Sequence, residues 1–250
     1  NQTVNTQPAM LAAGVAVYRA WLAQGGAQPV LMAGHSLGEY TALTCAGAIA
    51  FADALKLVRL RAEAMQSAVP EGVGAMAAVL GLDDEAVRAV CAEAAQGEVL
   101  AAVNYNSPGQ VVIAGNKAAV DRGCVLAKEK GAKRALPLPV SVPSHCALMQ
   151  PAAEKLLVAM SAIEIKAPAV PVIHNADVAS HADPAAIRDA LARQLYSPVR
   201  WVETVQAMAS QGVTRVAECG PGKVLAGLNK RILADLPTVA LADAAAFAAL

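Results

Sequence analysis

The chain has 250 residues, of which 56% are hydrophobic and 16% charged, so it can bury a sizeable core and is not a disordered tail. Its 20 basic and 20 acidic residues give a net charge of zero, which excludes a strongly basic field over the whole protein. Aromatic residues make up only 3%, which excludes the interleaved basic and aromatic residues typical of nucleic-acid binding.

The first 70 residues alternate between helical and strand patterns. Apolar residues recur at helical spacing from Leu11 to Leu22, on a helix that Thr6 can cap. The apolar stretch 29–34 has the length of a short buried strand. Two further helices are predicted, at 37–48 and 51–68.

The next segment has an element order of its own: strand, helix, strand, strand, helix, strand. This order is typical of a ferredoxin-like (βαββαβ) unit, and we expect it to be inserted as a small lid. Its predicted strands are 75–80, 99–105, 111–114 and 134–140, its helices are 83–95 and 117–130, and a turn spans 106–109.

Strands and helices alternate again in the last part of the chain. The predicted helices are 151–161, 183–195 and one from 223, and the predicted strands are 170–174 and 213–218. Such alternation indicates a largely parallel sheet covered on both faces. We therefore predict an α/β fold with an α/β-hydrolase-like parallel-sheet core, formed by 1–70 and 142–250, and a ferredoxin-like small subdomain, formed by 71–141.

The five cysteines are odd in number, widely spaced and without a C-x-x-C pair, which argues against a disulfide framework or a zinc site. No N-terminal stretch has the pattern of a signal peptide, and the longest uncharged apolar run, 40–52, is too short to span a bilayer. We expect a soluble cytoplasmic protein with free thiols, no metal and no membrane contact.

The motif G-x-S-x-G occurs at Gly34-His35-Ser36-Leu37-Gly38, directly after a predicted strand and before a predicted helix. A nucleophilic serine projects from a sharp turn, and the two glycines would avoid side-chain clashes there. The following helix would aim the N–H of Leu37 at a developing oxyanion. A chance loop is the alternative, but the strand–turn–helix context favours Ser36 as a nucleophile.

A nucleophilic Ser36 needs a base, and the chain has four histidines. His35 should point away from Ser36, His174 ends a predicted strand where a packed histidine is the default, and His181 lies in a polar stretch. His145 follows three prolines that would hold its approach rigid. The residues alone leave this choice open, although the order of the motifs argues against an ordinary hydrolase.

Arg61 lies on an apolar face of the predicted helix 51–68 and has no acidic residue three or four positions away. Arg59, by contrast, has Glu63 one turn on. A charge on such a face needs an anion from elsewhere, and a carboxylate ligand fits the planar guanidinium. An arginine that reaches solvent or pairs with a distant acid explains the pattern equally well.

Five motifs in order and spacing resemble the bacterial malonyl-CoA:acyl-carrier-protein transacylases of fatty-acid synthesis, over nearly the whole chain to about Leu233. The motifs are Thr6-Gln7-Pro8-Ala9, Gly34-His35-Ser36-Leu37-Gly38-Glu39-Tyr40, Asn104-Tyr105-Asn106-Ser107-Pro108-Gly109-Gln110, Val142-Pro143-Ser144-His145 and Gly220-Pro221-Gly222-Lys223.

The resemblance implies a ping-pong acyltransferase in which Ser36 carries the malonyl group as an ester. It also implies that His145 is the acid and base, that the backbone carbonyl of Gln194 orients its ring, and that Arg61 binds the free malonyl carboxylate. The substrates would be malonyl-CoA and phosphopantetheinylated acyl carrier protein. We expect no permanently bound cofactor and a monomer.

The resemblance further implies that Gln7 and Asn106 line the acyl pocket, and Met65, one turn after Arg61, can form part of its wall. Acyl carrier proteins are acidic, so a local basic surface must attract them, and Lys133 and Arg134 are the candidates.

One departure from the family pattern is evident. The family begins with a strand and a Gly-Gln-Gly loop that supplies a second oxyanion donor, and this sequence starts after that segment. We expect the chain as given to have one oxyanion donor fewer. A serine esterase or thioesterase, or an inactive fragment that binds carrier protein, are the alternatives to acyl transfer.

Overall fold

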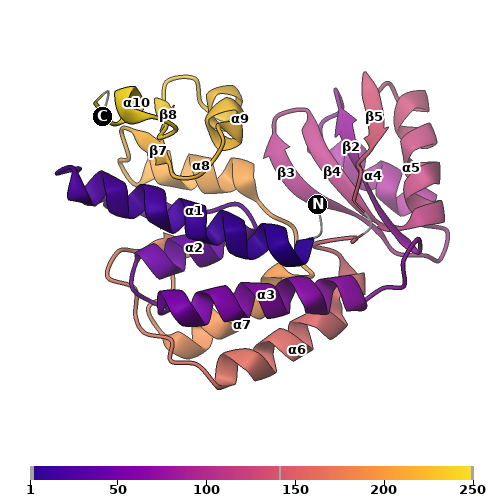
Figure 1. The fold of residues 1–250 in the computed structure, drawn as a ribbon. Helices are drawn as coiled ribbons and strands as arrows, with labels where there is room; N and C mark the ends of the chain where they lie inside the picture. The colour runs from indigo at the N-terminus through magenta and orange to yellow at the C-terminus, as the bar shows by residue number, and fades with distance from the viewer. Residues whose placement is uncertain (1–2, 141, 249–250) are drawn as a thin grey trace.

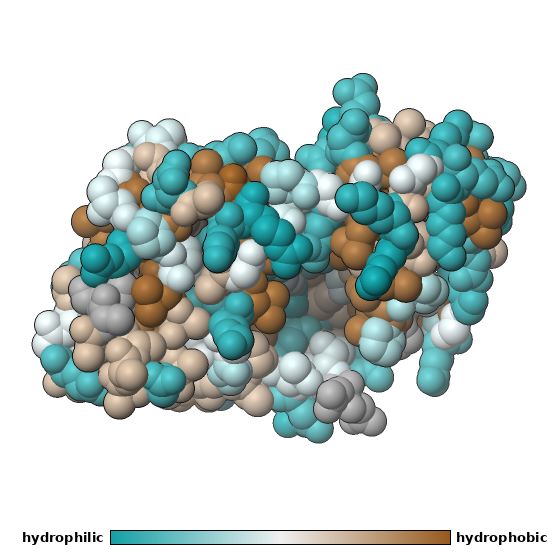
Figure 2. Space-filling view, turned by 90° about the horizontal axis from the view of Figure 1, so that it is seen from above, coloured by the Kyte–Doolittle hydropathy of each residue, from teal (hydrophilic) through white to brown (hydrophobic). Residues whose placement is uncertain are grey.

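Two lobes lie side by side in the computed structural model, which describes residues 3–140 and 142–248 (Figure 1). Seen from above, the molecule is hollowed between them (Figure 2). The larger lobe holds helices and parallel strands from both sides of an inserted segment, which forms a four-stranded antiparallel sheet in the smaller lobe. The predicted α/β fold with an inserted small unit is confirmed.

Helices dominate the larger lobe (Figure 1), where α1 packs across α2 and α3, and α6 packs against both α3 and α7. Their buried sides are mostly leucine, valine and alanine, and Leu11, Leu43, Leu156 and Leu191 are fully buried. Small alanines fill the spaces between these side chains, so a core with few aromatic residues can still be close-packed. The helices are α1 (Thr3–Ala23), α2 (Leu37–Cys45), α3 (Phe51–Ser67), α6 (Gln150–Ser161) and α7 (Pro184–Gln194).

The parallel strands form two pairs in the larger lobe. Strand β1 (Met32–Ala33) pairs with β6 (Val172–Ile173), and β7 (Val216–Glu218) pairs with β8 (Thr238–Ala240). The parallel direction agrees with the prediction. Among the described residues, however, the two pairs are separate sheets and not one continuous sheet.

The smaller lobe is an antiparallel sheet with the strand order β3-β4-β2-β5 and two helices, α4 and α5, which pack on each other and on the sheet. This is the predicted ferredoxin-like arrangement. The expected boundaries at 70/71 and 141/142 stay predictions, and residue 141 lies outside the described residues. The elements are β2 (Gly74–Leu80), α4 (Asp84–Ala95), β3 (Leu100–Ser107), β4 (Gln110–Asn116), α5 (Lys117–Glu129) and β5 (Arg134–Pro137).

Strand β3 joins the two lobes. The N–H of Tyr105 donates to the carbonyl of Val199 over 3.0 Å, and the N–H of Val199 donates to the carbonyl of Val103 over 2.8 Å. Cys146 packs on the sheet face opposite the helices, among Val103 and Val112. The segment around His145 and the end of β3 therefore meet at the boundary between the lobes.

Two details differ from the sequence-based expectations. Thr6 lies inside α1, which begins at Thr3. This earlier start was not predicted, because the polar residues before Thr6 have no apolar periodicity. Strand β3 continues through Asn106 and Ser107, so the turn is shorter than predicted. Gly109 permits this tight turn with a φ of 71°, a left-handed conformation that suits glycine.

The sequence pattern missed α8 (Trp201–Ser210), β8, α10 (Ala244–Ala248) and a 3-10 turn at Ala147–Met149. Helix α8 starts without a capping side chain and so lacks a start signal. Helix α10 is short and has no buried residue, so it has no apolar periodicity. Helix α9 (Val224–Ile232) begins where it was predicted. None of the described helices combines the length and the apolarity needed to cross a membrane.

Candidate active site

Ser36 stands at the tip of a sharp turn between β1 and α2. Its φ is 52°, a left-handed conformation that few residues other than glycine adopt. Gly34 lies against the first turn of α2, because a Cβ there would come within 1.9 Å of the carbonyl carbon of Gly38. A Cβ on Gly38 would meet nothing within 4 Å, so the predicted clash at this second glycine is wrong. Leu37 begins α2, and its N–H is among the first four of the helix, which have no partner within it.

His145 is the histidine that the fold brings to Ser36. Its Nε2 lies 2.8 Å from Ser36 Oγ, and its Nδ1 lies 2.7 Å from the backbone carbonyl of Gln194. A carbonyl can only accept, so Nδ1 carries the proton and Nε2 offers its lone pair to the serine. Burial of the ring and the charge of Arg61 together lower the pKa of His145 to about 3, against the opposite effect of the Gln194 bond. The imidazole is thus neutral and can accept a proton.

The other three histidines lie elsewhere. His35 turns away from the serine toward Asn106, with 2.8 Å between Nε2 and Oδ1, and its ring lies beside Trp201. Burial lowers the pKa of His35. His174 is fully buried with its Nδ1 2.7 Å from Glu39, and the Nε2 of the half-buried His181 lies 3.0 Å from Asp177.

Arg61 is 1% exposed, so it does not reach solvent. Among the described residues it also forms no ion pair with an acid. Its Nη1 donates to Gln7 Oε1 over 2.7 Å, and its Nη2 donates to Gln194 Oε1 over 3.0 Å and to Ser36 Oγ over 3.2 Å. Its Nε has no hydrogen-bond partner among the described atoms. A buried cation bonded only to neutral groups can accept an anion beside the serine. Arg59 forms the expected exposed pair with Glu63, with 3.0 Å between nitrogen and oxygen.

The predicted pocket residues reach this site from three elements. Gln7 of α1 is 7% exposed and donates from Nε2 to the sulfur of Met65 over 3.8 Å. Met65 lies one turn after Arg61 on α3 and is 4% exposed. Asn106 lies near the end of β3, and its side chain contacts His35 and not Ser36.

Three polar side chains around Ser36 have no counterpart in the predicted site. The carboxylate of Glu39 and the side-chain amides of Asn175 and Gln194 are fully buried and hydrogen-bonded to one another or to the serine turn. Two signals point to them: Glu39 is an acid on the otherwise apolar start of α2, and Asn175 follows the carboxyl end of a parallel strand, where sites gather.

Lys133 and Arg134 are exposed at the start of β5, the edge strand of the small sheet farthest from β3. The structure does not bring them into contact with Ser36, and their role stays a prediction.

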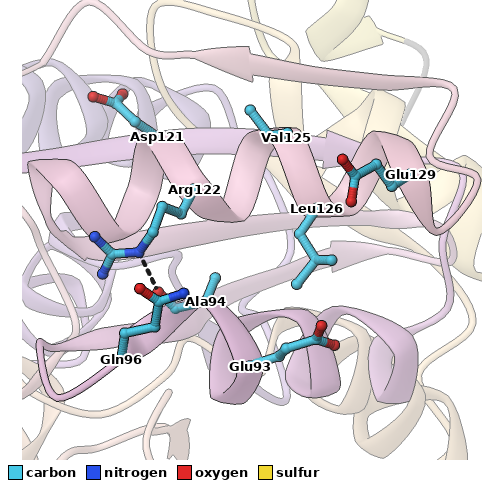
Figure 3. A pocket seen from close by; sticks show the side chains of 8 residues that line it. All are labelled: Glu93, Ala94, Gln96, Asp121, Arg122, Val125, Leu126 and Glu129. Carbon is cyan, nitrogen blue, oxygen red and sulfur yellow. Dashed lines mark hydrogen bonds between the residues drawn. The ribbon is translucent and has the colours of Figure 1, made fainter.

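A separate hollow of about 440 Å³ lies on the small lobe between α4 and α5 (Figure 3). Arg122 projects there between the helices and donates to the carbonyl of Ala94 over 2.9 Å. Glu93, Asp121 and Glu129 give this hollow an acidic lining, which does not suit an anionic ligand. None of the predicted site residues lines it, and the described residues contain no cluster of three or more potential metal ligands.

Comparison with known proteins adds independent findings. The family described as the acyl transferase domain matches residues 1–243. The chain is 60% identical over 249 residues to the malonyl CoA-acyl carrier protein transacylase of Escherichia coli K12, covering 100% of this chain and 81% of that protein.

Two solved structures superpose closely on the chain. The acyl-carrier-protein S-malonyltransferase of Burkholderia pseudomallei has a TM-score of 0.98 at 62% identity and covers 100% of this chain and 81% of that one. A malonyl-transacylase in complex with a type II PKS acyl-carrier protein has a TM-score of 0.98 at 56% identity, covering 99% and 80%.

Proposed function

This chain belongs to the acyl transferase family and, within it, to the malonyl-CoA:acyl-carrier-protein transacylases of fatty-acid synthesis, and from that premise we propose how its residues transfer the malonyl group. The observation that carries the proposal is the meeting of three groups on one atom. Ser36 Oγ lies 2.8 Å from His145 Nε2 and 3.2 Å from Arg61 Nη2.

In the first half-reaction, Ser36 Oγ attacks the thioester carbonyl carbon of malonyl-CoA while its proton passes to His145 Nε2. The N–H of Leu37 stabilises the oxyanion of the tetrahedral intermediate. The carbon–sulfur bond then breaks, and the proton on Nε2 goes to the departing sulfur. The products are malonyl-Ser36 and free CoA.

The second half-reaction reverses these roles. The phosphopantetheine thiol of the carrier protein gives its proton to His145 Nε2 and attacks the ester carbon. The carbon–oxygen bond breaks, Ser36 Oγ recovers the proton, and malonyl leaves on the carrier protein. The carbonyl of Gln194 holds the ring through Nδ1 during both steps, as its 2.7 Å contact allows.

Arg61 supplies the selectivity in this proposal. The malonyl carboxylate lies two carbons beyond the ester carbonyl, within reach of a guanidinium that touches Ser36 Oγ. The carboxylate would pair with the cation through two parallel hydrogen bonds. Gln7, Met65 and Asn106 form the wall of the pocket around it.

Several wider features belong to the same proposal. Carrier protein docks through Lys133 and Arg134, CoA thioesters are the donors, and no cofactor is permanently bound. The protein works in the cytoplasm as a monomer, with a core of 1–70 and 142–250 and a small subdomain of 71–141.

The test is to mix the protein with malonyl-CoA and to measure the intact mass and the labelled peptide. We expect one malonyl group on Ser36 and none on Ser36→Ala. An adduct on Cys45 or Cys146 would contradict the proposal. Burial raises the pKa of Cys45 to about 12 and that of Cys146 to about 11, so neither thiol is a ready nucleophile.

The same experiment separates the alternative functions. A serine esterase or thioesterase would release malonate to water faster than it passes malonyl to a thiol acceptor. An inactive carrier-protein-binding fragment would bind carrier protein but leave Ser36 unlabelled. The buried cation beside the serine favours transfer of a carboxylated acyl group over either alternative.

A further inference from the structure

Glu39 is a fully buried carboxylate, three residues after Ser36 in the first turn of α2. A buried carboxylate is costly unless nearby groups donate hydrogen bonds to its oxygens. Its place next to the nucleophile, with no role in proton transfer, raises the question of what its partners do.

Three donors converge on this carboxylate from segments far away in the sequence. His174 Nδ1 lies 2.7 Å from Oε1. The backbone N–H of Asn175 donates to Oε2 over 2.8 Å, and Gln194 Nε2 donates to the same oxygen over 2.9 Å. Glu39 thus ties the end of β6 and the end of α7 to the first turn of α2.

The first of these ties leads back to the serine turn. Asn175 Oδ1 accepts from the N–H of Ser36 over 2.7 Å, and Asn175 Nδ2 donates to the carbonyl of Gly34 over 2.8 Å. One amide therefore spans the turn on both sides of residue 35. It fixes Ser36 in the left-handed conformation that projects its hydroxyl.

The second tie leads to the cation and the base. Gln194 Nε2 also donates to the carbonyl of Ser36 over 2.9 Å, and its Oε1 accepts from Arg61 Nη2 over 3.0 Å. The backbone carbonyl of the same residue holds His145. Gln194 therefore contacts the serine turn and Arg61 through its side-chain amide, and the base His145 through its backbone carbonyl.

We propose that Glu39 is a positioning residue for acyl transfer, which acts through the backbone of Asn175 and the side-chain amide of Gln194 to hold Ser36 and Arg61 in their reactive arrangement. Its carboxylate dictates the orientation of the Gln194 side-chain amide, because an acceptor-only group requires that amide to present an N–H, and it anchors the backbone of Asn175, whose side chain holds the serine turn. The inference rests on the roles given to Ser36 and Arg61 above. It adds a second layer of hydrogen bonds without which those groups would be less well aligned.

Two substitutions at the same position separate this role from simple packing. Glu39→Met has a similar volume but removes both acceptor oxygens. Glu39→Gln keeps one acceptor oxygen for the backbone N–H of Asn175 and the side-chain amide of Gln194. Its new NH2 group then faces His174. The Nε2 of His174 has no partner among the described atoms, so the ring proton can move to Nε2. The Nδ1 can then accept a hydrogen bond from that NH2 group.

The measurement is the rate constant of Ser36 acylation at saturating malonyl-CoA and at saturating acetyl-CoA, per folded molecule, with the melting temperature recorded alongside. We expect Glu39→Met to lower the malonyl rate constant by roughly 10- to 100-fold and to reduce the preference for malonyl over acetyl. Glu39→Gln should stay within about threefold of the wild type.

Thr44→Val is the matched control. Thr44 is a buried polar residue of the same helix whose hydroxyl donates to the carbonyl of Tyr40 over 2.7 Å, away from Ser36. Its loss should lower the melting temperature and leave the acylation rate constant unchanged. Asn175→Ala is the second test should Glu39→Met not fold, and we expect the same loss of rate.

An unchanged rate constant in the folded Glu39→Met or Asn175→Ala variant would overturn the positioning role, as would an equal loss in Glu39→Gln and Glu39→Met. If the wild-type protein carried no malonyl on Ser36, the proposed function itself would be wrong. The two failures are therefore distinguishable.

Discussion

Arg61 combines deep burial with neutral partners, and the selectivity that we propose depends on this single residue. The amides of Gln7 and Gln194 hold its guanidinium at 2.7 and 3.0 Å but do not neutralise it. The ring of Tyr40 lies 5.3 Å below the guanidinium carbon and adds cation–π attraction. The cation is thus fixed in place while its charge stays available.

We predict that Arg61→Ala lowers kcat/KM for malonyl-CoA by roughly 10²–10³, since the malonyl carboxylate would be buried without its cation at a cost of about 3–5 kcal/mol. Transfer of acetyl, which has no carboxylate, should hold steady or improve. Arg59→Ala is the control, because Arg59 lies two positions away on the exposed side of α3. Equal losses for both substrates would show that Arg61 is structural.

The pH dependence of acylation follows from the low pKa of His145. Because burial and Arg61 lower it to about 3, the ring stays neutral and able to accept a proton well below the ordinary histidine range. We predict a rate constant of Ser36 acylation that is flat from about pH 5 to about pH 8 and falls only as the pH approaches that low value.

A malonyl thioester without phosphate groups should be used for this profile, so that the ionisations of CoA do not enter. His181→Gln, at a half-buried histidine away from the serine, should give the same flat profile. An acid limb with a midpoint near pH 6.5 would mean that His145 is protonated there and would contradict the low pKa caused by burial and Arg61.

The strand–turn–helix unit of β1 and α2 is the element that presents the nucleophile. Its two glycines look equivalent in the motif but differ in the structure. A Cβ atom at Gly34 would lie 1.9 Å from the carbonyl carbon of Gly38 and 2.5 Å from the backbone nitrogen of Glu39. A Cβ atom at Gly38 would face open space.

We predict that Gly34→Ala abolishes Ser36 labelling and lowers the melting temperature, because backbone atoms cannot yield to the new methyl group. Gly38→Ala should keep the labelling and stabilise the helix by about 0.5–1 kcal/mol. Calorimetry and malonyl labelling of the pair will check both. Similar damage from the two substitutions would show that the second glycine is needed for another reason.

At the scale of the whole molecule, the surface is hollowed between the two lobes (Figure 2). The serine turn lies at their boundary, since His35 contacts Asn106 of β3, and under the proposed function a carrier protein has to approach it there. The chain is neutral overall, so attraction of an acidic partner has to come from a local group of cations. Lys133 and Arg134 are exposed and adjacent at the start of the edge strand β5, which suits them to this role.

We predict that Lys133→Glu combined with Arg134→Glu raises KM for carrier protein several-fold at low salt, less at high salt, and leaves the acylation of Ser36 by malonyl-CoA unchanged. Lys155→Glu combined with Lys166→Glu changes the net charge equally on another part of the surface and serves as control. An unchanged KM at low salt, or the same increase in the control, would remove Lys133 and Arg134 from the docking surface.

The sequence by itself determined the features that local patterns encode. The order of helices and strands in the small lobe and the strand–turn–helix around Ser36 depend on periodicity and on turn residues within a few positions of each other. Arg61 was identified as unusual for the same reason, since its helical neighbours are all apolar. Helix α8 was missed because it lacks such a local start signal.

Only the tertiary structure decided which groups meet. Ser36 and His145 are 109 positions apart, Ser36 and Asn175 are 139 apart, and Gln194 is 158 positions from the serine carbonyl that it holds. No local pattern encodes such distances, so the residues alone left the choice of base and the environment of Arg61 open. The hydrogen bonds of Glu39, Asn175 and the Gln194 side chain appear only when β6 and α7 pack against α2, because a buried polar group is recognised by its partners and not by its neighbours in sequence.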